Sequence, residues 1–199
     1  MAELAPQTRK KTASDTRKRL LEAAGILSRK IGASGMSLDA VAATAGVSKG
    51  GLLYHFPSKH ALLRALVEDH VGAFGEEMAH RAPGWSSASG AAAIEAARAY
   101  VAVVRDLLRH TEGAASGIFA ALTEDPLFMA PLLDLRCEVR ALFARCPPEA
   151  MLVFHACEGL IHDRLIDPDH WDAPRVEAQL DLMDRMLVAI ARGTVRFAD

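Results

Sequence analysis

Apolar residues recur along this chain of 199 residues at spacings of three and four, the period of a helix that buries one face. No stretch shows the strict alternation that is typical of a half-buried strand. Glycine and proline gather between the periodic segments, where they start or end helices. Apolar residues make up 51% of the chain, which is enough for a packed core. The pattern therefore predicts an all-α protein with about nine helices.

Four of these helices are expected before the loop APGWSSASG, and five after it. We place the first four at about 16–31, 38–45, 48–56 and 59–82. Small polar residues precede each of them, with Ser14 or Asp15 as the expected cap of the first, and glycine or proline ends the first three. We place the later helices at about 91–111, 114–123, 126–145, 148–166 and 174–193. The two short helices around the turn at Gly46 have the spacing of a helix-turn-helix.

Charge is distributed unevenly along the chain, although the net charge is only −2. Residues 1–60 hold ten Lys and Arg against four acids, and they include all six lysines. Residues 61–199 hold thirteen Arg against twenty-one acids. A basic N-terminal part followed by an acidic remainder indicates that the N-terminal part meets a polyanion.

The letters SKGG, residues 48–51, open a helix of only two turns, although each glycine inside a helix costs about 1 kcal/mol relative to alanine. On a helical wheel, Leu52 and Phe56 point to the core, whereas Gly50 and Tyr54 point away from it. A turn without side chains can bring its backbone close to another surface, where the free N–H groups and the helix dipole favour anions. The phosphates beside a DNA major groove fit this description.

The segment MSLDAVAATAGVSKGGLLYHFPSKHALLRAL, residues 36–66, resembles the helix-turn-helix and the following helix of the TetR family of transcriptional regulators. The residues that carry the resemblance are Ala45-Gly46-Val47-Ser48, Gly50, Leu52, His55-Phe56 and Ser58-Lys59. The resemblance implies that the helix at 48–56 reads the major groove. It also implies that the fourth helix leads to a ligand-binding domain and that the last two long helices form a dimer interface.

Carried over by position, the resemblance assigns DNA contacts to Ser48, Lys49, Gly50, Tyr54, His55 and Lys59, with Ser37 and Thr44 as phosphate contacts. One position departs from the family, because the tyrosine that usually follows Leu52 and binds a phosphate is Leu53 here. Either Tyr54 takes over that contact, or Leu53 meets an apolar feature such as a thymine methyl group. His55 has an alternative role, which is packing against the first helix.

The remainder of the chain carries two candidate sets of apolar residues. The resemblance implies a pocket for a small molecule, and we expect its lining from Phe74, Met78, Tyr100, Phe119, Leu122, Phe128, Met129 and Leu132. Plain core packing is the alternative for each of these residues. A four-helix bundle between two copies of the chain is expected from Met151, Phe154, Ile161, Leu165, Leu180, Met183, Leu187 and Ile190.

Other chemistries have weak support in the sequence. Glu158 and His162, near His155 and Asp163, have the spacing of a metal pair, but inter-helix hydrogen bonds explain them equally well, so we assign no metal. No nucleophile motif or glycine-rich phosphate loop appears, so we expect neither an enzyme nor a cofactor. No apolar run has membrane-spanning length and no secretory signal is apparent, so we expect a cytoplasmic protein.

These observations together predict three parts: a flexible basic arm (1–13), a helix-turn-helix DNA-binding domain (14–60) and a helical domain for effector binding and dimerisation (61–199). The expected partners are double-stranded DNA, a small-molecule effector and a second copy of the chain. The predicted function is a repressor that leaves a palindromic operator when the effector binds. The alternative is a DNA-binding protein of the same family that a protein partner controls, or that has no small-molecule effector.

Overall fold

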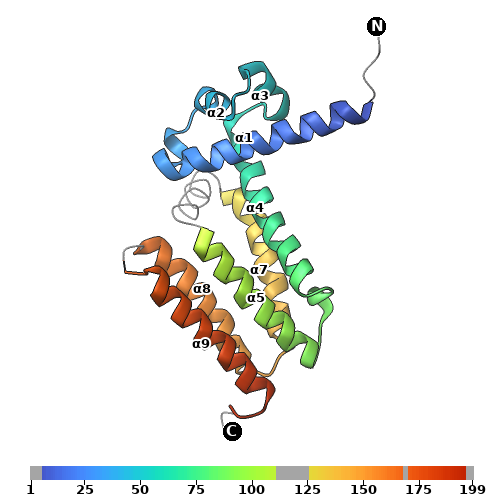
Figure 1. Cartoon of the computed structure of the whole chain (residues 1–199), viewed down its shortest axis with the longest axis vertical. Helices are drawn as coiled ribbons and strands as arrows, with labels where there is room; N and C mark the ends of the chain where they lie inside the picture. Colours follow the sequence, from blue (N-terminus) through green and yellow to red (C-terminus); the bar gives the residue numbers. More distant parts are fainter. Residues whose placement is uncertain (1–5, 111–125, 168–169, 196–199) are drawn as a thin grey trace. The chain divides into compact units, whose positions relative to one another are not determined.

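The computed structural model describes residues 6–110, 126–167 and 170–195, and these residues form eight α-helices and two short 3₁₀ helices, with no strand among them (Figure 1). The expected all-α class is therefore confirmed. The helix that we expected at 114–123 lies outside the described residues. The described helices include none that is both long enough and apolar enough to cross a membrane.

The chain divides into two compact units, and helix α4 (Lys59–Arg81) contributes to both of them. As far as they are described, residues 1–70 and 113–129 form the first unit, and residues 71–112 and 130–199 form the second. The boundary that we expected from the sequence lies ten residues earlier, at the start of α4.

The first unit contains α1 (Pro6–Gly35), α2 (Leu38–Ala45) and α3 (Lys49–His55), as well as the 3₁₀ helix η2 (Pro126–Phe128). Helix α1 packs against α2, and α2 against α3 (Figure 1). The buried side chains of this unit include Leu20, Leu21, Ala24, Val41, Leu52, Phe56, Leu62 and Leu63.

Helix α1 begins at Pro6, ten residues before the start expected from the sequence. Proline is favoured in the first turn of a helix, and the Gln, Arg and Lys residues that follow have good helix propensity. Ser14 and Asp15 therefore lie inside α1 rather than capping it, and residues from Pro6 onward of the expected arm belong to this helix. Gly32 has a positive φ of 73°, as expected for a residue that interrupts the helix.

The two short helices have the boundaries that their capping residues predict. The Ser37 hydroxyl accepts from the N–H of Ala40 at 3.1 Å, and α2 ends at Gly46, which has a left-handed φ of 63°. The Ser48 hydroxyl accepts from the N–H of Gly51 at 3.1 Å, and α3 ends before Phe56. These contacts satisfy N–H groups that the first turn of a helix leaves without partners.

The second unit contains the rest of α4, the 3₁₀ helix η1 (Trp85–Ser87), and helices α5 (Ala91–His110), α7 (Met129–Phe143), α8 (Ala150–Ile166) and α9 (Ala173–Ala191). Helix α9 packs against both α5 and α8 (Figure 1). The single helix expected at 126–145 is instead η2 followed by α7, because a 3₁₀ turn often precedes the first α-helical turn.

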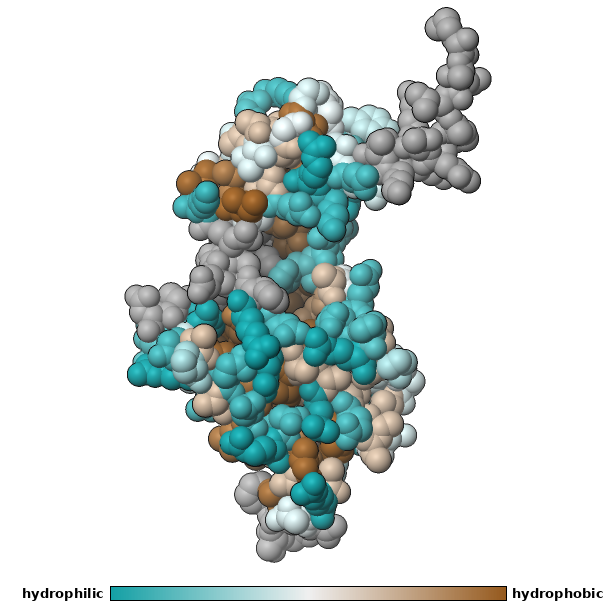
Figure 2. Space-filling view, in the orientation of Figure 1, coloured by the Kyte–Doolittle hydropathy of each residue, from teal (hydrophilic) through white to brown (hydrophobic). Residues whose placement is uncertain are grey.

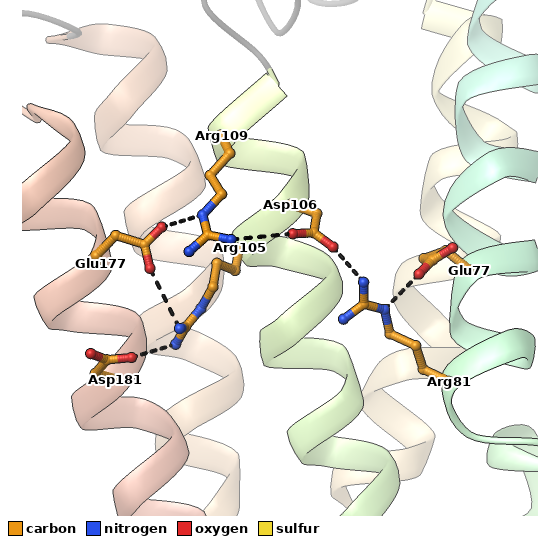
Figure 3. A network of polar contacts seen from close by, with 7 residues as sticks. All are labelled: Glu77, Arg81, Arg105, Asp106, Arg109, Glu177 and Asp181. Carbon is orange, nitrogen blue, oxygen red and sulfur yellow. Dashed lines mark hydrogen bonds and ion pairs between the residues drawn. The ribbon is translucent and has the colours of Figure 1, made fainter.

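Ion pairs join three helices of the second unit at its surface (Figure 3). Arg81 on α4 pairs with Glu77 and with Asp106 on α5. Arg109 on α5 pairs with Asp106 at 3.8 Å and with Glu177 on α9 at 2.5 Å. The network continues from Glu177 to Arg105 (3.4 Å), which also pairs with Asp181 at 2.7 Å. Hydrophilic residues cover much of the visible face of this unit, with hydrophobic ones between them (Figure 2).

Candidate nucleic-acid interface and polar cluster

Helix α3 has a buried face and an open face, as its helical wheel predicts. Leu52 and Phe56 are buried, whereas the Tyr54 side chain is 82% exposed and that of Leu53 is 40% exposed. An aromatic ring that is open to solvent on a two-turn helix is available to a partner surface. Tyr54 stands beside His55, whose ring meets it edge-on at a centroid distance of 5.1 Å.

The two glycines of α3 have different surroundings. A Cβ built on Gly51 would lie 2.9 Å from Val47 Cγ1 and 3.2 Å from the Ser48 hydroxyl, so a side chain there would force these neighbours to shift. A Cβ built on Gly50 would meet nothing within 4 Å. Packing within the first unit therefore favours glycine at position 51, and nothing in this unit favours it at position 50.

The polar residues around this face have contacts within the chain. Lys49 Nζ lies 2.9 Å from the carboxylate of Asp39 on α2, in an exposed ion pair. Lys59 Nζ donates to the Ser34 carbonyl oxygen at 2.9 Å. The hydroxyls of Ser37 and Ser48 accept from their own helices, and each keeps its own proton free to donate to a phosphate.

The remaining predicted contacts are divided by exposure. Thr44 on α2 is exposed, while the His55 side chain is half-buried and its ring also lies 6.4 Å from that of Phe56. Six of the residues predicted to contact DNA lie on α3 or at its N-terminus, and all but His55 are exposed: Ser48, Lys49, Gly50, Leu53, Tyr54 and His55. Their contact with DNA stays a prediction.

Two arginines of α1 contact residues of the helix-turn-helix, and the sequence analysis did not predict these contacts. Arg19 Nη2 donates to the carbonyl oxygens of Ala45 (2.6 Å) and Gly46 (3.1 Å), where it complements the negative end of the α2 dipole. The Arg17 guanidinium lies 5.5 Å from the centroid of the Phe56 ring, within cation–π range. Nothing in the local pattern of α1 predicts these contacts, because their partners are more than twenty residues away.

The apolar residues predicted to line a pocket do not form one group. Phe74, Met78 and Tyr100 belong to the core cluster of the second unit, where Met78 and Tyr100 are fully buried. Phe128 belongs to the first unit and packs on His60 at a ring distance of 4.6 Å. Of the other predicted residues, Met129 and Leu132 are half-buried, and Phe119 and Leu122 lie outside the described residues.

A polar cluster lies in the second unit among aromatic rings. The Tyr100 hydroxyl on α5 donates to Glu158 Oε1 on α8 at 2.9 Å. Arg136 Nη2 on α7 lies 2.7 Å from Glu158 Oε2. Burial, and then the charge of Glu158, raise the pKa of Tyr100 well above its ordinary value, so this hydroxyl stays protonated and donates. The sequence analysis predicted Tyr100 as a pocket residue and considered Glu158 as part of a metal pair. It did not predict that both lie beside Arg136, because the three residues are far apart in the sequence.

The metal alternative does not match this geometry. Glu158 turns its carboxylate toward Tyr100 and Arg136, while His155 is exposed. The His162 ring donates from Nδ1 to the backbone carbonyl of Glu158 at 2.6 Å. In the described part of the chain, no three His, Cys, Asp or Glu side chains are placed to hold a metal ion.

Most residues predicted for the dimer interface are covered by the chain itself. Those buried in the core of the second unit are Phe154, Leu180, Met183, Leu187 and Ile190. Met151 and Ile161 are half-buried against the same core, and the Leu165 side chain is not described. The periodicity marked the inner face of α8 and α9, because the residues that pack in the core are the most regularly apolar. The large apolar side chains exposed on these helices are Leu152 and Leu182, as far as the chain is described.

Comparisons with known proteins agree on one family. Residues 20–66 match a model described as bacterial regulatory proteins, tetR family, and residues 95–188 match a tetracyclin repressor-like C-terminal domain. Together these matches cover about seven-tenths of the chain. A comparison with curated protein sequences found no match.

Similar solved structures support the same architecture. A TetR family member from Streptomyces coelicolor A3 is 21% identical, with 86% of this chain and 97% of that chain covered and a TM-score of 0.64. The multidrug binding protein EbrR, complexed with malachite green, is 22% identical over 85% of this chain and 96% of that one, with a TM-score of 0.62. AibR, in complex with isovaleryl coenzyme A and operator DNA, is 19% identical, with 86% of this chain and 97% of that chain covered and a TM-score of 0.62. At these identities the likeness shows the fold.

Proposed function

The chain belongs to the tetR family of bacterial regulatory proteins, and on this premise we propose that it is a homodimeric repressor of transcription in the cytoplasm. Its helix α3 binds the major groove of a palindromic operator, and a small molecule bound in the second unit releases it. The proposed activity is binding and not catalysis.

The surroundings of Gly50 carry the DNA-binding part of the proposal. An isolated first unit has no use for a glycine at this position, since a side chain there would meet nothing within 4 Å and would favour the helix. A partner that comes close to the backbone does need it. The exposed Tyr54 ring and the hydroxyl of Ser48 stand beside this backbone and match a groove edge with its phosphates.

Charge supports the same assignment. The Lys49–Asp39 ion pair is exposed, so it contributes little to stability and can be exchanged for a phosphate contact at small cost. Each phosphate that a lysine neutralises releases counterions from the DNA, which makes the affinity depend on salt.

The small-molecule part of the proposal draws on the relatives and on α4. EbrR is complexed with malachite green, and AibR with isovaleryl coenzyme A and operator DNA. In this chain α4 contributes to both units, so a ligand that shifts α4 in the second unit also acts on the first. The ligand favours a conformation in which the two copies of α3 no longer match the operator.

The proposed dimer uses the outer faces of α8 and α9. Leu152 and Leu182 are half exposed there, and Gly159 of α8 is exposed with open space around it. A second copy that pairs its α8 and α9 with these faces would cover both leucines in a four-helix bundle.

Fluorescence anisotropy with DNA from around the protein's own gene tests the proposal. We expect tight binding to one fragment in the presence of competitor DNA, with an affinity that falls as salt rises. Lys49→Gln should weaken binding and reduce the salt dependence, whereas Lys30→Gln, an exposed lysine of α1, serves as the charge-matched control. Binding that is equally weak for every fragment would contradict the proposal.

The same assay distinguishes the effector-controlled repressor from the alternative, which is control by a protein partner. Specific binding to DNA with no release by any small molecule would favour that alternative. Release by a low-molecular-weight extract would favour the effector-controlled repressor.

A further inference from the structure

One buried group of the polar cluster lacks a partner. The Nε atom of Arg136 is inaccessible to solvent and forms no hydrogen bond, and among the described residues no other buried side-chain nitrogen or oxygen is left in this state. Such a group has lost its contacts with water and gained none in return, and the cost is larger when the group is charged. Buried polar groups in folded proteins nearly always have a hydrogen-bond partner, so this one needs an explanation.

We infer that Arg136 is the polar anchor of the effector site and that the effector is an apolar molecule with a carboxylate. This inference rests on the proposed function, because it assigns a site and a ligand class to the effector that releases the DNA. Arg136, Tyr100 and Glu158 all lie in the second unit, so the site needs nothing from the first.

The pattern of hydrogen bonds selects the charge of the ligand. Both oxygens of Glu158 are engaged, one by the Tyr100 hydroxyl and one by Arg136 Nη2. The unsatisfied group is an N–H of Arg136, so the cluster lacks an acceptor and not a donor. A planar guanidinium that offers Nε and Nη2 on one edge matches the two oxygens of a carboxylate.

The surroundings select the rest of the ligand. The Tyr100 ring lies 6.0 Å from that of Phe74, 5.5 Å from Phe143 and 6.2 Å from Phe154. Aromatic rings of this kind pack against an aliphatic chain or another ring. The Arg136 side chain is 30% exposed, so the cluster has an open side through which a carboxylate can be exchanged.

The position of Phe74 connects this site to regulation. Phe74 is a partly buried residue of α4, and its ring meets that of Tyr100 edge-on. A ligand that enters among these rings displaces Phe74, and α4 moves with it. The same helix begins in the first unit, so a small displacement at this site reaches the DNA-binding motif.

Matched pairs of probes test the ligand class on the full-length chain without DNA. The carboxylates are butyrate, octanoate, laurate and phenylacetate, and the partners are butylammonium, octylammonium, dodecylammonium and phenethylammonium. Binding is measured by calorimetry and by the shift of Tm. We expect at least one carboxylate to bind and to raise Tm, and its ammonium partner to bind at least tenfold more weakly.

Variants then test the anchor. Arg136→Gln should weaken the bound carboxylate at least tenfold, and Arg136→Lys should weaken it less because the charge remains. Arg140→Gln, an exposed arginine one turn further along α7, loses the same charge and should bind as the unmodified chain does. Glu158→Gln should bind the carboxylate more tightly, because the competitor for Arg136 is weakened. A merely structural role for Glu158 would give the opposite change.

The outcomes separate this inference from the proposed function. If no carboxylate binds, if the ammonium partners bind more tightly, or if Arg136→Gln and Arg136→Lys both bind normally, the inference is overturned, and specific DNA binding in the anisotropy assay still stands by itself. If a carboxylate binds through Arg136 and the operator affinity does not change, the site is supported, and it is the release mechanism of the proposed function that fails.

Discussion

At the scale of single residues, two adjacent glycines in α3 are explained by different surfaces. Gly51 is favoured by packing within the chain, since its Cβ would lie 2.9 Å from Val47 Cγ1. Gly50 faces open space, so its lack of a side chain matters only to a partner. The sequence alone cannot show which glycine is explained by packing within the chain and which by a partner, because that distinction depends on where Val47 lies in the fold.

The two alanine variants of these glycines should therefore have opposite effects. Gly50→Ala should leave the free energy of unfolding unchanged or raise it by up to about 1 kcal/mol, because alanine favours the helix. It should weaken operator binding by about 1–3 kcal/mol, since the added methyl group overpacks a close contact. Gly51→Ala should instead lower the free energy of unfolding by about 1 kcal/mol. Urea denaturation and anisotropy measure both quantities, and full DNA affinity in Gly50→Ala would refute the close approach at this position.

His70 gives the chain a dependence on acid. Burial lowers the pKa of His70 below its ordinary value, and Asp69 opposes this shift with a smaller effect. The unfolded chain therefore takes up a proton at a higher pH than the folded chain does. This contribution to stability is complete above the ordinary histidine pKa of 6.5 and decreases as pH falls below it, by at most about 1.4 kcal/mol per pH unit.

Replacing His70 should remove this part of the acid sensitivity. We expect His70→Gln to lose less stability than the unmodified chain between neutral pH and about pH 5. Its matched control is His80→Gln, an exposed histidine of the same helix. Urea denaturation at several pH values measures the difference, and parallel pH profiles for the unmodified chain and His70→Gln would contradict the assignment.

At the scale of elements, the sequence predicts best the helices that are delimited by local chemistry. The bounds of α2 and α3 follow from serine caps, from Gly46 and from the proline after Phe56, and all of these act within a few residues. The start of α1 was predicted too late, because Ser14 and Asp15 fit an N-cap and the interior of a helix almost equally well. The contacts of Arg19 and Arg136 were not predicted at all, since they join helices that are distant in sequence.

The ion-pair network offers a test at this scale, because it joins α4 to α5 and α9 (Figure 3). Asp106→Asn removes the carboxylate that Arg81 and Arg109 share. These side chains are partly exposed, so we expect a loss of only about 0.5–1 kcal/mol at low salt, which shrinks toward zero near about 1 M NaCl.

The control for this network is an ion pair that stays within one helix. Glu68→Gln breaks only the pair between Arg64 and Glu68 on α4, which should be worth about 0.3–0.5 kcal/mol. Thermal unfolding at low and high salt compares the two variants. An effect of Asp106→Asn that does not depend on salt would show that Asp106 acts through packing and not through its charge.

At the scale of the whole molecule, the difficulty lies in deciding what covers an apolar face. Periodicity predicted that a second copy covers the apolar stripes of α8 and α9, and the structure shows that the chain itself already buries Phe154 and Leu180 of these stripes. An amphipathic pattern shows that one face of a helix is buried, but it does not show whether the same chain or a second copy covers that face. The less regular outer face, with Leu152, Gly159 and Leu182, is where a second copy has room.

Charge placed on this outer face should therefore separate the two copies. Leu182→Glu puts a carboxylate where the proposed bundle excludes water, which should weaken the dimer by about 3 kcal/mol or more, over a hundredfold in its dissociation constant. Leu133→Glu on α7 is the matched control, because Leu133 is 48% exposed and Leu182 is 46% exposed. Light scattering after size-exclusion chromatography gives the mass of each variant. If Leu182→Glu stays dimeric while Leu133→Glu becomes monomeric, the interface lies on α7, and the Gly159 face needs another explanation.

If only Leu182→Glu becomes monomeric, its operator binding should also weaken. A palindromic operator binds the protein tightly only when the two copies of α3 that contact its half-sites belong to one dimer.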